Sequence, residues 1–434
     1  MIQNVLDKMG FDSLNDIQEA SIEANIHAKD VVILAPTGSG KTLGFLLPVL
    51  AMLDPEVGGV QALILVPARE LAMQIEQVFR TMGTGHKVSC CYGGHPMRIE
   101  KNNLLQAPAV LVGTPGRITD HIGRGNIDVS TIKTLVLDEF DKSLEMGFER
   151  EMTYIINQLS DIQKHILTSA TQSIEIPSFT GIKSAVELNF LSDTMVQGLT
   201  QKAVRSVGRD KLDVFFRLIC ELGNETTLVF CNHREAVNRT SKHLSDKGIV
   251  HDIFHGGMEQ DERERALLKF RNKSHHLLIT TDLASRGLDI PEVKNIIHYH
   301  LPNKEDAFIH RNGRTARMNA EGTSFVILGE DEDLPKYITE APVFVEVNDL
   351  MEVPPLPEWV TLYIGGGKKD KINKIDIVGL LLQKGGLKKD ELGLIEVLDH
   401  TAFVAVKRSK ANKVLDLLMD ERIKKKKVKI AISK

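Results

Sequence analysis

The residues best suited to chemistry lie in the segment Ala35–Thr42, which reads Ala-Pro-Thr-Gly-Ser-Gly-Lys-Thr and directly follows a predicted strand. Glycines let backbone N–H groups curl around phosphate oxygens, and the start of the helix expected next adds positive potential. Lys41 would then reach the outer phosphates of a nucleotide, and the Thr42 hydroxyl would ligate Mg²⁺. The alternative is a plain Gly-Ser turn before a helix, which Gly-Lys-Thr at this place disfavours.

A pair of carboxylates stands where another predicted strand ends. Asp138 and Glu139 follow the apolar run Thr134–Leu137, and a carboxylate at the carboxyl end of a parallel strand faces the ligand crevice. Asp138 is placed to hold Mg²⁺ through its water shell, and Glu139 to orient or deprotonate an attacking water. An Asp-Glu pair alone is usually a solvated turn. With the phosphate loop upstream, the pair predicts a catalytic site.

A third segment, His310–Arg317, is rich in basic side chains and contains no acidic one. Helical spacing puts His310, Arg314 and Arg317 on one face, with Arg311 beside them. Two interpretations remain open. The segment is either an exposed basic helix face or an arginine finger that a second lobe contributes to a γ-phosphate held by the first. In the second case hydrolysis would need closed lobes, which would couple ATP to shape.

The elements that must position these residues are short aliphatic and β-branched runs that alternate with helical patterns. Continuously apolar runs are typical of strands buried on both faces, as in parallel sheets covered by helices. There are too many for one sheet, so we predict two α/β lobes in tandem, joined near residues 191–206. The runs are Val31–Ala35, Ala62–Pro67, Val88–Cys91, Val110–Gly113, Thr134–Leu137, Ile166–Thr168, Thr227–Phe230, Asp252–His255, Leu277–Thr281, Ile296–His300 and Ser324–Leu328.

A second boundary is marked by Pro354-Pro355-Leu356-Pro357, which cannot continue a helix or a central strand and predicts a stiff linker. The pattern behind it predicts strand, helix, strand, strand, helix and strand. This βαββαβ order is typical of a split-βαβ, RRM-like domain. The elements are expected at Val360–Ile364, Ile375–Gln383, Leu394–Leu398, Ala402–Val406, Lys410–Met419 and Val428–Ile432.

Charge is distributed unevenly along the 434 residues, whose net charge is −4. Residues 359–434 carry 18 Lys and Arg against 9 Asp and Glu, a balance of +9 that leaves −13 on residues 1–358. A basic tail on an acidic body indicates a polyanionic partner for the tail, and a merely soluble lysine-rich surface is the equally open alternative.

Location is bounded by what the sequence lacks. No apolar run approaches the ~18 residues that span a bilayer, and the N-terminus has no signal core, so a cytoplasmic location is expected. The four cysteines form no zinc-binding pattern and are expected to be reduced, buried, small apolar side chains. They are Cys90, Cys91, Cys220 and Cys231.

The ordered motifs within residues 1–345 resemble those of the DEAD-box RNA helicases of superfamily 2. The resemblance implies two tandem RecA-like α/β lobes, an RNA-dependent ATPase and helicase activity, and ATP and Mg²⁺ as cofactors. The matching segments are Gly10-Phe11 with Ile17-Gln18, Ala35–Thr42, Pro67–Leu71, Gly93-Gly94, Thr114–Arg117, Asp138–Asp141, Ser169–Thr171, Val229–Asn232, Gln260 with Arg263, Thr281-Asp282, Ala284–Asp289 and His310–Arg317.

The resemblance also implies a role for each matched residue. The catalytic residues would be Glu139, Asp138, Lys41, Arg311 and Arg314. Nucleotide contacts are expected from Gln18, Thr37, Gly38, Ser39, Gly40, Lys41, Thr42 and Asp289, with Thr42 and Asp138 at the metal. Residues that couple ATP to unwinding would be Asp141, Ser169, Thr171 and His310. RNA contacts are expected from Arg69, Gly94, Thr114, Arg117, Gln260, Arg263, Thr281 and Arg286.

Two departures from the family pattern bear on function. The second motif reads Asp-Glu-Phe-Asp because Phe140 replaces a small residue. The replacement leaves the catalytic carboxylates of the motif unchanged but is expected to alter contact with Ser169–Thr171 or His310, and so to affect coupling more than hydrolysis. Ala68 replaces the usual Thr of the first RNA motif and removes one hydroxyl donor.

The tail, residues 359–434, is similar to the RNA-binding domain of DbpA-type helicases, through Leu362–Lys371 and Val404–Val406. Phosphates would be paired by Lys368, Lys369 and Lys371. Tyr363 and Phe403 would stack on bases if they face outward, although core packing is the favoured interpretation for Phe403. The run Lys424–Lys427 is either a set of phosphate contacts or a solvated turn.

Together these features predict a monomeric ATP-dependent RNA helicase that unwinds short duplexes locally. Its three domains are expected at 1–195, 206–350 and 359–434. The resemblance of the tail implies large-subunit ribosomal RNA as the partner and a role in ribosome assembly. A general RNA chaperone or decay helicase is one alternative, and an ATP-gated RNA clamp that does not unwind is another.

Overall fold

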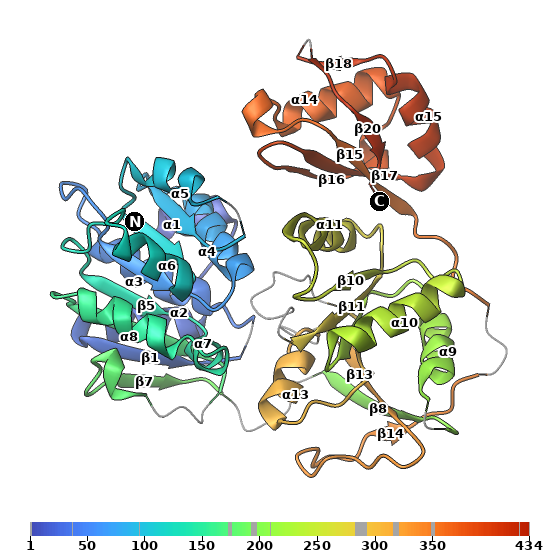
Figure 1. The fold of residues 1–434 in the computed structure, drawn as a ribbon, viewed down its shortest axis with the longest axis horizontal. Coiled ribbons are helices and arrows are strands. Elements are labelled where there is room, and N and C mark those ends of the chain that lie inside the picture. Colours follow the sequence, from blue (N-terminus) through green and yellow to red (C-terminus); the bar gives the residue numbers. More distant parts are fainter. Residues whose placement is uncertain are drawn as a thin grey trace. The chain divides into compact units, whose positions relative to one another are not determined.

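The chain falls into two compact units, the first holding the described residues up to 191 and the second those from 198 onward (Figure 1). The predicted site residues Thr37, Arg286 and Asp289 lie outside the described residues. The computed structural model describes residues 2–36, 38–94, 96–171, 176–191, 198–208, 210–282, 293–315, 321–348, 352–424 and 426–433.

The first unit is built on a seven-stranded sheet of order β3-β4-β2-β5-β6-β1-β7, in which every pair of neighbours is parallel. Its central strands are buried along their whole length, as the continuous apolar runs predict. The strands are β1 (Asp30–Leu34), β2 (Ala62–Leu65), β3 (Val88–Cys91), β4 (Val110–Gly113), β5 (Thr134–Leu137), β6 (Lys164–Ser169) and β7 (Val186–Asn189).

Helices cover both faces of this sheet and create two separate cores. Because side chains alternate along a strand, Val31 and Ile33 of β1 enter one core, while Val32 and Leu34 enter the other. The helices are α1 (Ile2–Met9), α2 (Asp16–His27), α3 (Lys41–Met52), α4 (Arg69–Thr81), α5 (Met97–Leu104), α6 (Pro115–Gly123), α7 (Phe140–Glu145) and α8 (Glu149–Gln158), with the short η1 (Ser178–Thr180).

The second unit begins with another parallel seven-stranded sheet, of order β10-β11-β9-β12-β13-β8-β14. Two parallel α/β sheets in tandem confirm the predicted architecture of the lobes. The elements are β8 (Leu199–Arg205), α9 (Leu212–Leu222), β9 (Thr227–Cys231), α10 (Arg234–Asp246), β10 (Asp252–Phe254), α11 (Gln260–Arg271), β11 (Leu277–Thr281), β12 (Asn295–His298), α13 (Glu305–Asn312), β13 (Gly322–Leu328) and β14 (Val343–Phe344).

The tail forms an antiparallel four-stranded sheet of order β16-β17-β15-β20 with its own apolar core. The expected βαββαβ order is confirmed, and the described chain adds a short hairpin before the last strand. The elements are β15 (Trp359–Ile364), η2 (Lys368–Asp370), α14 (Lys374–Gly379), which continues into the wider turn η3 (Leu380–Lys384), η4 (Lys389–Glu391), β16 (Leu392–Val397), β17 (Ala402–Lys407), α15 (Arg408–Leu418), β18 (Arg422–Ile423), β19 (Lys426–Lys427) and β20 (Ile430–Ile432).

Within the two large sheets, three strands have no counterpart in the sequence prediction, namely β7, β8 and β14. β8 lies inside the stretch expected to join the lobes, yet it pairs with β13 along its full length. Its sequence, Leu-Thr-Gln-Lys-Ala-Val-Arg, is mostly polar and only its end is buried. A hydrophobic pattern cannot reveal such a strand, because pairing with a neighbour supplies the stabilisation that burial supplies elsewhere.

The described cysteines are free thiols, and Cys91, Cys220 and Cys231 are buried. Burial raises the pKa of Cys231 to about 12, so the thiol stays protonated at neutral pH. None of the helices in the described part of the chain combines the length and apolar character needed to cross a bilayer.

Phe140, the departure in the second motif, is a core residue. Its side chain is fully buried in the core that also holds Leu65 and Leu137, and its ring centroid lies 6.3 Å from that of Phe179. The large ring therefore fills volume beneath the carboxylates that flank it in sequence, and its burial contributes to the stability of the first unit.

We expect Phe140→Ala to lower the free energy of unfolding by about 3 kcal/mol, because the substitution removes buried apolar surface and leaves a cavity. Urea denaturation of the full chain measures the change. Phe11→Ala is the matched control, since Phe11 is 49% exposed and should cost less than about 1 kcal/mol. Equal losses for the two variants would contradict the core assignment.

Candidate functional site

The carboxyl edge of the first sheet collects the predicted residues of the first unit. In a parallel sheet every strand ends at the same edge. The loops after β1, β5 and β6 carry the predicted nucleotide and coupling residues, and the loops after β3, β4 and β2 carry the predicted RNA contacts. These two sets of strands are contiguous in the sheet and meet where β2 pairs with β5.

The phosphate loop follows β1 and ends in a left-handed glycine. Gly38 and Gly40 have φ angles of 86° and 90°, which L residues with side chains rarely adopt. Lys41, the first residue of α3, donates from Nζ to the carbonyl oxygens of Ala35 and Pro36, the latter at 2.8 Å. Its ammonium therefore lies within the curl of the loop. Thr42 follows in the first turn of α3.

The start of the helix α2 supports this loop through side-chain hydrogen bonds. Asn15 and Gln18 form a capping box at its start, and Asn15 Nδ2 donates to the Ser39 carbonyl oxygen at 3.0 Å. Gln18 Nε2 donates to the Gly40 carbonyl oxygen at 3.5 Å. A Cβ on Gly40 would come within 2.8 Å of both side-chain amides. The structure thus brings Gln18 to the phosphate loop and reveals Asn15 as a second support.

The two carboxylates after β5 adopt a strained turn. Glu139 has a φ angle of 47°, an uncommon conformation that in non-glycine residues often marks a functional site. The Thr168 hydroxyl donates to Asp138 Oδ1 and accepts the backbone N–H of Glu139 at 3.1 Å. Thr168 lies on β6, the neighbour of β5, so pairing of the strands fixes the direction of both acidic residues.

The predicted coupling residues of this unit form one hydrogen-bonded chain. Thr171 Oγ1 donates to Asp141 Oδ2 at 3.3 Å, and the Ser169 hydroxyl contacts both the backbone and the side chain of Thr171. Asp141 lies in the first turn of α7, one residue beyond Phe140. A displacement of the loop after β6 would therefore be transmitted directly to the helix that follows the catalytic carboxylates.

Asp138 has the properties of a carboxylate that a hard cation would stabilise. It is 4% exposed. Burial raises the pKa of Asp138, while the Thr168 hydroxyl and the charge of Lys41 act in the opposite direction. Oxygen donors such as the Asp138 carboxylate and the Thr42 hydroxyl are the ligands that Mg²⁺ prefers. The donor set therefore fits the predicted metal.

Two predicted RNA contacts of the first unit lie against each other. Arg69 opens α4, and Gly94 has a φ angle of 102° in the loop after β3. A Cβ on Gly94 would fall 2.2 Å from Arg69 Nη1, so a side chain there would displace the guanidinium. Thr114 and Arg117 begin α6 after β4. The structure thus brings all four residues to neighbouring loops.

In the second unit Arg311 is a buried clamp. It is 1% exposed and binds Asp282 through Nε and Nη2, both at 2.6 Å. It also donates to the His300 carbonyl oxygen at 2.6 Å and to Asn232 Oδ1 at 2.9 Å. These partners follow β11, β12 and β9, which are neighbours in the sheet. Arg311 therefore ties three strand ends together.

A neutral histidine completes this clamp. His298 is fully buried and lies between Phe230 and Phe308, with centroid distances of 6.4 and 4.7 Å. Burial lowers the pKa of His298 to about 3, and the charge of Arg311 acts in the same direction. The imidazole is therefore uncharged at neutral pH and adds no repulsion to the guanidinium.

The other predicted residues of the second unit lie around the same sheet. Thr281 ends β11 and is 9% exposed, while His310 and Arg314 lie within and just after α13. Gln260 and Arg263 are in the first turn of α11. Arg263 stacks over the Phe254 ring at 4.7 Å, which fixes its stem.

In the tail, the three described lysines of the run Lys424–Lys427 form ion pairs with acidic residues. Lys424 pairs with Asp376 at 2.9 Å, Lys427 pairs with Asp420 at 2.9 Å, and Lys426 pairs with Asp370. The pairs of Lys424 and Lys426 join the hairpin to α14 and η2, and the pair of Lys427 joins it to the segment just after α15. Lys368, Lys369 and Lys371 lie in and after η2, where Lys369 pairs with Asp399 at 3.4 Å. These pairs are exposed and stabilise weakly.

The two aromatic residues considered for stacking share one face of the tail sheet. Leu362 and Val404 belong to the apolar core, so alternation directs Tyr363 and Phe403 to the opposite face. The two rings are directly paired across β15 and β17, with centroids 5.7 Å apart. Phe403 is nevertheless 3% exposed, so it is a buried side chain, as the favoured interpretation expects, although it lies on the face opposite Leu362 and Val404.

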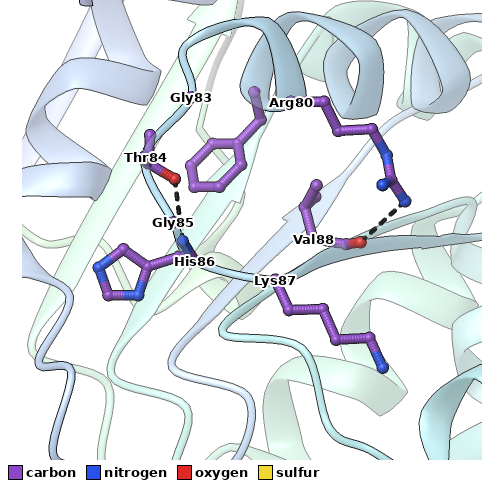
Figure 2. Close-up of a pocket in the computed structure, with 8 residues that line it drawn as sticks. Arg80, Gly83, Thr84, Gly85, His86, Lys87 and Val88 are labelled. Carbon is purple, nitrogen blue, oxygen red and sulfur yellow. Dashed lines mark hydrogen bonds between the residues drawn. The ribbon is translucent and has the colours of Figure 1, made fainter. Parts of the chain in front are cut away.

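A surface hollow of about 340 Å³ lies elsewhere on the first unit (Figure 2). Its lining runs from Phe79 to Val88, from the end of α4 to the amino end of β3. Arg80 there donates to the Val88 carbonyl oxygen at 3.3 Å. The hollow adjoins the amino end of a strand, so it contains none of the predicted site residues.

Sequence reasoning did not identify Asn15, Thr168, Asn232 or His300 as supports of the site. Asn15 carried a readable signal, because Asn followed three residues later by Gln is a capping pattern. Thr168 and His300 gave none, because their importance depends on which strands become neighbours. Pairing between strands far apart in sequence is invisible to local patterns.

Comparison with known families divides the chain into three matching segments. Residues 15–178 match the DEAD/DEAH box helicase family, and residues 210–319 match the helicase conserved C-terminal domain. Residues 361–432 match the DbpA RNA binding domain. The three matches fall on the two parallel sheets and the antiparallel tail, in that order.

Whole proteins give the same result. The chain is 30% identical to the ATP-dependent RNA helicase DbpA of Bacillus subtilis over 99% of its length and 96% of that protein's. The Escherichia coli protein of that name is also 30% identical, with the same two shares. Among solved structures, S. cerevisiae Dbp5 bound to RNA and ADP BeF3 is 27% identical with a TM-score of 0.70, covering 80% of this chain and 93% of that one.

We expect Gly40→Ala to weaken binding of a fluorescent ATP analogue about tenfold, since a left-handed alanine costs roughly 1–2 kcal/mol and its Cβ would displace Asn15 and Gln18. Titration of the analogue measures the affinity. Gly58→Ala is the control, because nothing lies within 4 Å of a Cβ added there. Unchanged affinity in Gly40→Ala would contradict this geometry of the phosphate loop.

Proposed function

The chain belongs to the DEAD-box ATP-dependent RNA helicases, as one of the DbpA type, and from that premise we propose how its residues carry the activity. The observation that supports the proposal most strongly is the carboxyl edge of the first sheet. There the phosphate loop and the Asp138–Glu139 pair share an edge with Arg69, Gly94, Thr114 and Arg117. ATP and an RNA strand would therefore bind to adjacent loops of one rigid sheet.

In the proposed mechanism each residue of the ATP site has a separate task. The left-handed glycines aim backbone N–H groups at the phosphates, and Lys41 neutralises the outer phosphates. Thr42 and Asp138 would hold Mg²⁺, which supplies charge neutralisation of the phosphate oxygens. Glu139 accepts a proton from the attacking water, and its strained backbone fixes the carboxylate in advance.

Coupling is proposed to run through Asp141, Thr171 and Ser169, because these side chains join the catalytic loop to the end of β6. Phe140, which precedes Asp141 in α7, packs in the apolar core. It is proposed to hold the coupling residues in place through this packing. A duplex would be unwound when the contacts to ATP and the contacts to RNA change in the same step. If the protein displaced RNA strands equally well without ATP, this coupling would be contradicted.

The basic segment of the second unit divides into two proposed roles. Arg311 already binds Asp282, Asn232 and a backbone carbonyl, and breaking a buried pair of this kind costs about 3–5 kcal/mol. We therefore assign Arg311 the role of holding α13 in place. The γ-phosphate role predicted from the sequence is kept for Arg314.

The tail is proposed to deliver the enzyme to large-subunit ribosomal RNA, so that local unwinding serves ribosome assembly. Support comes from the basic balance of residues 359–434 and from the match to the DbpA RNA binding domain. Lys368 and Lys369 lie in a short turn after β15 and are proposed as phosphate contacts. The division 1–195, 206–350 and 359–434, a monomeric state and a cytoplasmic location complete the proposal.

We expect Glu139→Gln to lower RNA-stimulated ATP hydrolysis by about 100-fold or more, because a general base contributes at least that much. ATP binding and RNA binding should persist, so that RNA stays bound in the presence of ATP. Phosphate release and RNA fluorescence anisotropy measure the two properties. Glu149→Gln, an exposed acid at the start of α8, is the control. Normal hydrolysis in Glu139→Gln would refute the assignment.

The RNA target is tested by comparing RNAs that stimulate ATP hydrolysis by the full chain. We expect a large-subunit ribosomal RNA fragment to act at lower concentration than poly(U). Lys368→Ala with Lys369→Ala should raise that concentration by about tenfold and leave the poly(U) response unchanged. Lys410→Ala with Lys413→Ala, on α15, is the control of equal charge.

Equal stimulation by every RNA would favour a general RNA chaperone over a ribosomal role. Stimulation of hydrolysis without displacement of a short duplex would favour a clamp. The first outcome would exclude the ribosomal role, and the second would exclude unwinding. Neither outcome would change the family assignment.

A further inference from the structure

Glu100 is a buried carboxylate to which neither the sequence motifs nor the comparisons give a role. It lies on α5 and is 2% exposed, although carboxylates are rarely buried unless paired. Its Oε1 accepts the backbone N–H of Tyr92 at 2.7 Å. Its Oε2 lies 2.8 Å from His121 Nε2 and 3.4 Å from Arg117 Nε.

These contacts join two loops that carry predicted RNA contacts. Tyr92 leads directly into Gly93-Gly94, which follows β3, and Arg117 lies in the first turn of α6, which follows β4. His121 is one turn further along α6, fully buried, and its Nδ1 lies 3.2 Å from Asn126 Nδ2. One carboxylate therefore fixes the start of α6 against the glycine turn.

The same cluster has the composition of a metal site but the contacts of an ion pair. The ligand atoms of Cys91, Glu100 and His121 lie within 4.8 Å of one another. However, the Arg117 guanidinium already supplies positive charge beside the Glu100 carboxylate. Burial, reinforced by the charge of Glu100, raises the pKa of Cys91, which keeps it a protonated thiol and a poor metal ligand.

We propose that Glu100 is a positioning residue for RNA binding, acting through Arg117. The inference rests on the proposed function, in which Arg117 and the Gly93-Gly94 turn contact the RNA backbone. A long arginine side chain loses rotamer freedom when it binds a phosphate, and one already held in place loses less. Glu100 also holds the turn in register with Arg117, so both meet one stretch of backbone.

The structure offers a matched control in the same unit. Asp30 and His165 form another buried carboxylate–imidazole pair, with Asp30 Oδ1 and His165 Nδ1 2.8 Å apart. Asp30 begins β1, so this pair lies at the amino end of the strand that leads to the phosphate loop. Loss of either carboxylate should lower stability, but only loss of Glu100 should alter RNA binding.

The test uses Glu100→Gln, Arg117→Ala, their combination and Asp30→Asn, each in the full chain. Glu100→Gln should raise the poly(U) concentration for half-maximal ATPase stimulation about tenfold, the size expected for one charge-assisted hydrogen bond. The affinity for a fluorescent ATP analogue should stay within about twofold of wild type. Asp30→Asn should leave both quantities unchanged, and urea denaturation compares the stabilities.

The double variant tests whether Glu100 acts through Arg117. Contacting residues give non-additive effects, so adding Glu100→Gln to Arg117→Ala should cause no further loss. If Glu100→Gln does not fold, Glu100→Asp replaces it, and it should give a smaller rise because the charge is kept.

Three results would overturn the proposal. Additive losses, or an RNA response in Asp30→Asn equal to that in Glu100→Gln, would reduce Glu100 to a structural residue. An unchanged RNA response in Glu100→Gln, with a clear loss in Arg117→Ala, would overturn the inference and leave the proposed RNA contact intact. No loss in Arg117→Ala itself would instead remove the RNA contact on which the inference rests.

Discussion

In a parallel sheet the carboxyl ends of all strands lie at one edge, and both large sheets of this chain are parallel throughout their described pairs. This constraint decides where chemistry can occur. Loops that are a hundred residues apart in sequence become neighbours because their strands pair. The β2–β5 pair joins the loop of Arg69 to the loop of Asp138, so the RNA and ATP ends of the site are adjacent.

The position of the site at the carboxyl edge also explains why buried polar side chains form hydrogen bonds to the loops there. A loop at a strand end has little regular structure, so side chains from the neighbouring strand must hold it. Thr168 on β6 directs Asp138 and Glu139 on the loop after β5. Asn15 and Gln18 do the same for the phosphate loop from α2. These side-chain contacts limit the movement of the functional groups.

Much of this could be predicted from the sequence, and the limits are physical. The eleven apolar runs correspond to strands because full burial on both faces leaves a continuous hydrophobic signal. The sequence did not predict β7, β8 and β14, because strands at a sheet edge and strands with polar side chains carry no continuous hydrophobic signal. The phosphate loop was legible because its chemistry is local, with glycines and a lysine in eight residues. The clamp of Arg311 was not, because Asp282, Asn232 and His300 follow three different strands.

Arg311 and Glu100 show one solution to a shared difficulty. A parallel edge must keep several loops in register, and apolar contacts cannot do so without covering the surface that binds ligand. A buried charge can, because it is costly unless every partner is in place. Arg311 requires three strand ends to be correctly aligned, and Glu100 requires Tyr92, Arg117 and His121 together. Such groups add little net stability, but they penalise each misaligned arrangement, which is what a site assembled from separate loops needs most.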